Sequence, residues 1–100
     1  MGGFYGVMIK SLRELYLDCN LFVFLPQEIG NLSGLRGLHV DHNQLISLPS
    51  EIGTLRNLER LHLENNRIAN LPRKIGTLSS LRELHLECNR SEERRVGKEC

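Results

Sequence analysis

The chain has 100 residues and carries 13 Lys and Arg residues against 12 Asp and Glu residues, for a formal net charge of +1. This length fits one small domain, and the balanced charge excludes an electrostatic case for binding nucleic acid or an anionic membrane surface. Hydrophobic residues make up 40% and aromatic residues only 5%, with no Trp, so we expect an aliphatic core. The longest apolar run, residues 21–25, is far too short to cross a bilayer.

The first residues and the cysteines bear on location. Residues 1–11 lack the basic and apolar regions of a signal peptide, and we interpret them as a decayed repeat or an N-terminal cap. The three cysteines include no Cys-x-x-Cys pair, which argues against a disulfide framework and favours a reducing compartment. We therefore expect a cytoplasmic protein.

From Leu12 onward the sequence repeats with a period of 23 residues, marked by Leu12, Leu35, Leu58 and Leu81. The shared pattern is LxxLxLxxNxLxxLPxxIGxLxx. It fills residues 12–34, 35–57 and 58–80, and a partial copy covers residues 81–89. A single unit of this kind cannot bury its own leucines, so neighbouring units must stack.

Each unit predicts the same elements in the same order. Leucines alternate around a polar residue, as Leu61 and Leu63 do around His62, which is typical of a strand with one buried face. One asparagine per unit follows, and we expect all four to be buried and hydrogen-bonded to the backbone: Asn20, Asn43, Asn66 and Asn89.

The Leu-Pro-x-x-Ile-Gly segment of each unit predicts a short helical turn. Proline suits its first position and glycine its left-handed end. The prolines are Pro26, Pro49 and Pro72, and the glycines are Gly30, Gly53 and Gly76.

Over residues 12–89 this pattern resembles the leucine-rich repeat family, and its LPxxIGxL form of 23 residues is similar to the intracellular Ras-associated type. The resemblance implies an α/β solenoid with parallel β-strands on the concave face and short helical or irregular turns on the convex face. It also implies a non-enzymatic protein–protein interaction module of the signalling-scaffold type. A small GTPase or a signalling enzyme would be its partner.

Two other functions remain open. The segment could be the sensor or regulatory part of a larger enzyme or immune receptor, which only further sequence on either side could decide. It could also be a fragment of an extracellular receptor. A glycan on Asn31, in the sequon Asn31-Leu32-Ser33, would identify the latter.

The residues that flank the strand leucines are expected to point to solvent. Because adjacent strands lie about 4.8 Å apart, equivalent residues form columns. One column would hold Tyr16 and three histidines, with an acidic column beside it, and Tyr and Arg often anchor interfaces. The predicted partner-binding surface consists of Tyr16, Asp18, Arg36, His39, Asp41, Arg60, His62, Glu64, Arg82, His85 and Glu87.

We expect no catalytic group, cofactor or metal on this surface. Evenly spaced histidines do not converge on one point, although His39 and His62 could do so with Asp41 or Glu64. No Ser or Cys stands in the histidine column as a nucleophile, and a shallow sheet does not exclude water. Neighbouring imidazoles repel when protonated, so partner binding could vary with pH.

The repeat pattern fails at the end of the chain. Residues 90–100 carry mixed charge with one aliphatic residue and read as a disordered or foreign tail. We therefore expect a monomeric fragment of a longer repeat protein. Near the start, Leu21, Val23 and Phe24 are additional apolar residues. They either pack on Phe4 and Tyr5 as an N-terminal cap or form a contact patch for a partner.

Overall fold

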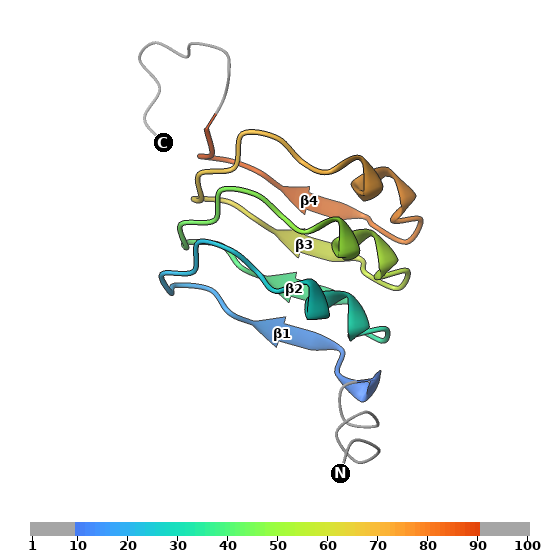
Figure 1. Cartoon of the computed structure of the whole chain (residues 1–100). Helices are drawn as coiled ribbons and strands as arrows, with labels where there is room; N and C mark the ends of the chain where they lie inside the picture. Colours follow the sequence, from blue (N-terminus) through green and yellow to red (C-terminus); the bar gives the residue numbers. More distant parts are fainter. Residues whose placement is uncertain (1–9, 91–100) are drawn as a thin grey trace.

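The computed structural model describes residues 10–90, which form the rungs of a solenoid (Figure 1). Each predicted repeat supplies one short strand, and the strands form a parallel sheet in the order β1-β2-β3-β4. Each strand residue pairs with the residue 23 positions later, as Leu38 does with Leu61. The strands are β1 (Glu14–Tyr16), β2 (Gly37–His39), β3 (Arg60–His62) and β4 (Glu83–His85).

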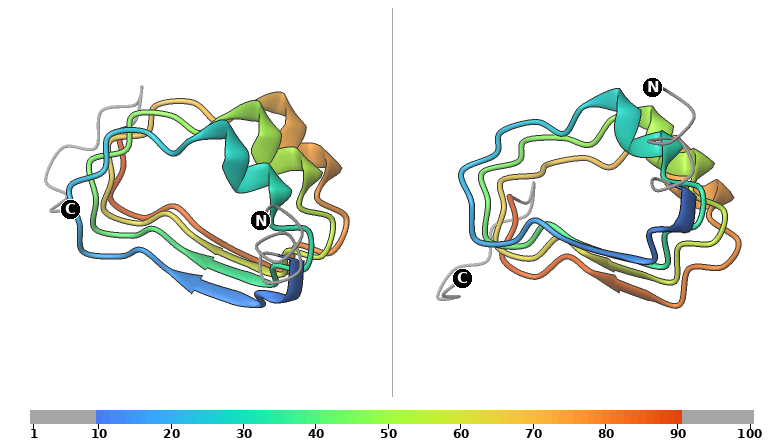
Figure 2. Two further views of the ribbon diagram at one scale, coloured as in Figure 1. Left: turned by 60° about the horizontal axis from the view of Figure 1, so that its bottom comes forward. Right: turned by 90° about the horizontal axis from the view of Figure 1, so that it is seen from below.

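Within residues 10–90, three 3₁₀ helices lie on the side of the solenoid opposite the sheet (Figure 2). They are η1 (Gln27–Asn31), η2 (Ser50–Thr54) and η3 (Arg73–Thr77). This arrangement confirms the predicted α/β solenoid. The predictions for the N-terminal cap, its packing on Phe4 and Tyr5, and the tail lie largely outside the described residues. None of the helices in residues 10–90 is long and apolar enough to span a bilayer.

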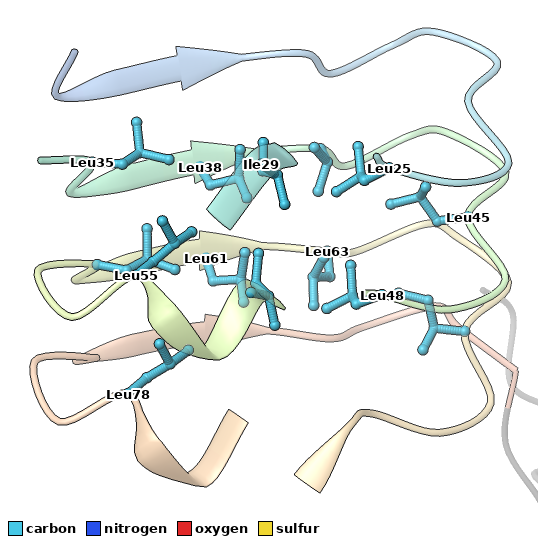
Figure 3. Close-up of a cluster of buried hydrophobic side chains, with 14 residues drawn as sticks. Leu25, Ile29, Leu35, Leu38, Leu45, Leu48, Leu55, Leu61, Leu63 and Leu78 are labelled. Carbon is cyan, nitrogen blue, oxygen red and sulfur yellow. The ribbon is translucent and has the colours of Figure 1, made fainter. Parts of the chain in front are cut away.

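The core fills the space between the sheet and the 3₁₀ helices (Figure 3). Leu61 and Leu63 point into it with no exposed surface, while His62 between them is half-buried on the other face. Burying one leucine fully contributes about 1.5–3 kcal/mol. The core is aliphatic, as predicted, and consists of Leu25, Ile29, Leu35, Leu38, Val40, Leu45, Leu48, Ile52, Leu55, Leu58, Leu61, Leu63, Ile68 and Leu78.

The asparagines of the second, third and fourth repeats join each repeat, or rung, to the one before it. Asn66 donates from Nδ2 to the carbonyl oxygens of Val40 and Leu63, both at 3.0 Å. Its Oδ1 accepts from the Leu45 backbone N–H at 3.0 Å. Asn43 is bonded in the same way, and both asparagines are buried.

The prediction that all four asparagines are buried is wrong at the two ends. Asn20 is exposed and donates within its own rung, to the carbonyl oxygens of Leu17 and Asp18. Asn89 bonds to the preceding rung through Leu63 but remains half-buried. An asparagine is therefore buried only where a rung covers it on each side.

The convex turns differ from the prediction in two details. The prolines are N-caps with extended backbone, as Pro49 shows at ψ 148°, and the helix begins one residue later. The glycines lie inside the helices and are not left-handed residues. A Cβ on Gly30 would lie 2.7 Å from the carbonyl oxygen of Glu51, and one on Gly53 would lie 2.8 Å from that of Lys74. Glycine is thus required at these two positions by the close approach of the next rung.

The left-handed residue of each rung instead comes directly before the asparagine. Its backbone N–H donates to the next rung, as that of His42 does to Glu64 at 3.0 Å. This turn redirects the chain from the strand towards the convex side. Among residues 10–90 the non-glycine residues with positive φ are Cys19, His42, Asn65 and Cys88, at 58°, 57°, 58° and 63°.

Candidate functional site

Four rings lie stacked across the concave face, one from each strand. The parallel register places Tyr16, His39, His62 and His85 opposite one another. From Tyr16 to His85, the centroids of consecutive rings are 4.2, 4.6 and 4.4 Å apart, and the angles between their planes are 15°, 13° and 6°. We call these four residues the ring stack. It forms a flat and ordered strip along the sheet.

The acidic column runs beside the ring stack, two residues farther along each strand. Oε2 of Glu64 lies 3.5 Å from Nδ1 of His62, and Oε2 of Glu87 lies 3.8 Å from Nδ1 of His85. Asp41 instead contacts His42, with Oδ2 2.9 Å from Nδ1. The predicted juxtaposition of histidines and acids therefore exists, with His62 and His85 near acids at distances longer than a typical hydrogen bond.

A cluster of charged side chains spans three strands on the other side of the ring stack. Oε1 of Glu14 lies 3.2 Å from Nε2 of His39, and Oε2 accepts a hydrogen bond from Arg60. Glu14 and Arg60 belong to β1 and β3, and they meet because Gly37 stands between them on β2. A Cβ at Gly37 would collide with the Glu14 carboxylate. Glycine at this position therefore leaves room for Glu14 of β1 and Arg60 of β3 to meet across β2.

The environment of Glu14 favours its ionised form. Burial opposes ionisation, but the hydrogen bonds from His39 and Arg60 outweigh it and lower the pKa of this carboxyl. Arg60 is also hydrogen-bonded to Glu59 at 3.3 Å, so its guanidinium is already occupied within the protein. Arg60 is therefore a weaker anchor for a partner than its sequence position indicates.

The remaining predicted contact residues fall into two groups. Tyr16 has 64% of its surface exposed, and Glu87, Arg36 and Arg82 are also exposed. Arg36 and Arg82 come immediately before their strands and lie outside the ring and acidic columns. The half-buried group consists of Asp18, His39, Asp41, Arg60, His62, Glu64 and His85.

Two acids that the predicted surface does not include, Glu14 and Glu83, also lie beside the ring stack. Each precedes a ring-stack residue by two positions, so the repeat register could have identified them. Oε1 of Glu83 lies 3.3 Å from Nε2 of His85, and this contact raises the pKa of His85. Ligand atoms of His62, Glu83 and His85 all lie within 4.8 Å of one another. This group differs from the predicted combination of His39 and His62 with Asp41 or Glu64.

Within residues 10–90, the cysteines do not resemble catalytic nucleophiles. Desolvation and the nearby carboxylates of Asp18 and Asp41 raise the pKa of the free thiol of Cys19, which keeps it protonated at neutral pH. Cys88 is disulfide-bonded. The spacing of the cysteines did not predict this disulfide.

Solved structures with the same architecture include two bacterial proteins. The leucine-rich repeat protein LIC12759 of Leptospira interrogans is 44% identical, with a TM-score of 0.81 over 82% of this chain and 21% of that chain. Internalin C2 of Listeria monocytogenes is 26% identical, with a TM-score of 0.70 over 88% of this chain and 37% of that chain. The present chain thus spans well under two thirds of either protein.

No curated protein matches the chain. The model of the leucine-rich repeat region matches residues 7–100, which is nearly the whole sequence. The 23-residue period, the parallel strands, the asparagine ladder and the two solved structures agree with this match. The chain belongs to the leucine-rich repeat family.

Proposed function

We propose that this chain is a non-enzymatic protein-recognition module that binds a protein partner on its concave face. The observation that carries the proposal is the ring stack, because its four aligned rings form a continuous row across the four strands, with Tyr16 exposed at one end. Leucine-rich repeats suit protein recognition since their concave surface is extended and already ordered. Little conformational entropy is then lost on binding.

The charges on this face indicate what the partner presents. The two columns on either side of the ring stack carry six acids, and the one arginine in these columns, Arg60, is already paired with Glu14 and Glu59. Arg36 and Arg82 lie outside these columns, immediately before β2 and β4. A partner with a basic surface would complement this arrangement. The acids are Glu14, Asp18, Asp41, Glu64, Glu83 and Glu87.

The similarity to the Ras-associated repeat type supports a more specific proposal. We infer a cytoplasmic signalling scaffold whose partner is a small GTPase or a signalling enzyme with a basic contact surface. Glycan on Asn31 of the protein isolated from its native source would contradict this location.

The concave site is tested by affinity capture with two matched variants. Tyr16→Ala combined with Glu87→Lys changes two exposed concave residues, while Arg56→Glu changes an exposed residue on the convex side. We expect the concave variant to lose partners that the wild-type chain and the convex variant both retain. Circular dichroism would verify that both variants fold.

Arg60 is left unchanged in this design because its replacement would also break the contact with Glu14. Capture of the same partners by the folded concave variant would show that the concave face is not the binding surface.

A further inference from the structure

We propose that His62, Glu83 and His85 form a binding site for a single zinc ion on the rung between β3 and β4. Each residue offers one ligand atom, and the three atoms lie within 4.8 Å of one another. Two imidazole nitrogens and one carboxylate oxygen are a donor set that zinc accepts. This proposal concerns a property of the concave face that does not depend on any protein partner.

The backbone brings the three side chains together. His62 and His85 are paired residues in the parallel register, and Glu83 precedes His85 by two positions on the same face of β4. The two imidazoles are nearly parallel, with an interplanar angle of 6° and centroids 4.4 Å apart. Since an imidazole nitrogen binds a metal in the plane of its ring, at least one ring must turn out of the stack for both nitrogens to reach one zinc ion. Because both strands belong to the solenoid sheet, the site requires no ordering of a loop.

Flanking carboxylates lie near the Nδ1 atoms of both imidazoles, at distances longer than a typical hydrogen bond. His85 has Glu87 3.8 Å from its Nδ1 and Glu83 3.3 Å from its Nε2, so its two nitrogens face different acids. His62 likewise has Glu64 3.5 Å from its Nδ1. A carboxylate on the far nitrogen of a ligating histidine is the usual outer arrangement of zinc sites and increases the basicity of the imidazole. Oε1 of Glu64 is buried without a hydrogen bond, so this carboxylate could interact with the positive charge of a bound zinc ion.

The chemistry of the donors selects zinc over the common hard cations. Magnesium and calcium bind through oxygen ligands, whereas imidazole favours zinc and its neighbours among the transition metals. Zinc bonds of about 2.0–2.2 Å require the three donors to move closer together. The half-exposed Glu83 side chain, at 52%, has room for this movement. Three protein ligands leave a fourth position for water or for a donor from a bound partner.

The neighbouring rung lacks this combination and provides an internal control. His39 and His62 are also stacked, but the positions two residues before them hold Gly37 and Arg60. On β3, Arg60 stands at the position that Glu83 occupies on β4, and its positive charge would oppose a cation between His39 and His62. That charge is partly neutralised because Arg60 is paired with Glu14 and Glu59.

Isothermal titration of zinc chloride into the full-length chain tests the site, in a Cys19→Ser background that removes the free thiol. We expect one zinc ion per chain and no binding of magnesium chloride. His62→Gln and His85→Gln should each raise the Kd by more than about tenfold, since even outer-sphere changes cost that much. His39→Gln, the matched stacked histidine, should leave the Kd unchanged.

Imidazole NMR gives a second readout on the same samples, with zinc shifting the ring resonances of His62 and His85 but not those of His39. Three results would overturn the proposal. They are an absence of zinc binding by the parent chain, retained affinity in His62→Gln, and an equal loss in His39→Gln.

Discussion

The two central rungs and the two outer rungs carry nearly the same motif but differ in burial. Leu38 and Leu61 on the central strands have no exposed surface, whereas Leu84 on β4 remains 37% exposed. Asn66 is buried, and Asn20 in the equivalent position is exposed. The difference teaches that a repeat motif specifies which side of the chain faces inward, while the neighbouring rungs decide how much of it is buried.

The largest expected effect is the contrast between Leu61→Ala and Leu84→Ala. Removing the fully buried leucine should lower the free energy of unfolding by about 2–5 kcal/mol, and the outer change should cost less than about 1 kcal/mol because Leu84 is partly exposed. Urea unfolding followed by circular dichroism measures both values. Equal losses would mean that β4 is covered in solution by further protein or by self-association.

Asparagine substitutions should show a smaller contrast. Asn66→Ala leaves the Leu45 N–H and two carbonyl oxygens without their side-chain partner. Unsatisfied buried groups cost about 1–3 kcal/mol. Asn20→Ala should cost no more than about 0.5 kcal/mol since Asn20 is solvent-exposed. The same unfolding measurement tests this pair, and a neutral Asn66→Ala would contradict the observed ladder.

Alanine substitutions at two convex glycines should change the stability of the chain in opposite directions. Gly53→Ala places a methyl group against the backbone of η3, and such overpacking costs about 1–3 kcal/mol. Nothing lies within 4 Å of a Cβ at Gly76. Gly76→Ala should therefore stabilise the chain by about 0.4–1 kcal/mol, by restricting the unfolded state. Thermal melting of the two variants measures both changes in stability, and a lower melting temperature for Gly76→Ala would contradict the open space around Gly76.

The smallest effect concerns pH and the contact between β1 and β3. The folded-state pKa of Glu14 is lowered, so its ionised form stabilises the fold above the ordinary value of 4.5, and this stabilisation is lost as the pH falls through the lowered pKa. Glu14→Gln should therefore destabilise the chain at neutral pH and much less at pH 3. Urea midpoints of both proteins between pH 3 and pH 7 measure the difference. A difference in urea midpoint that stays constant across that range would show that Glu14 does not contribute to the loss of stability in acid.

Periodicity made much of this architecture predictable. The 23-residue spacing placed every strand, and the alternation around His62 identified the inward leucines. The sequence could not show that Gly30 and Gly53 are needed for close rung contact, because that depends on backbone separation across the stack. It also did not reveal that Arg60 is occupied by Glu14, a contact between residues 46 positions apart.

The hydrogen bond between Glu14 and Arg60 also affects how the molecule comes apart. In an ideal solenoid each unit is coupled only to its immediate neighbours, so the end units can unzip one at a time. Arg60 reaches past β2 to Glu14 and adds a second-neighbour coupling. Detachment of the first strand then also removes a partner from the third. Gly37, by lacking a side chain, leaves the space on β2 that this second-neighbour contact requires.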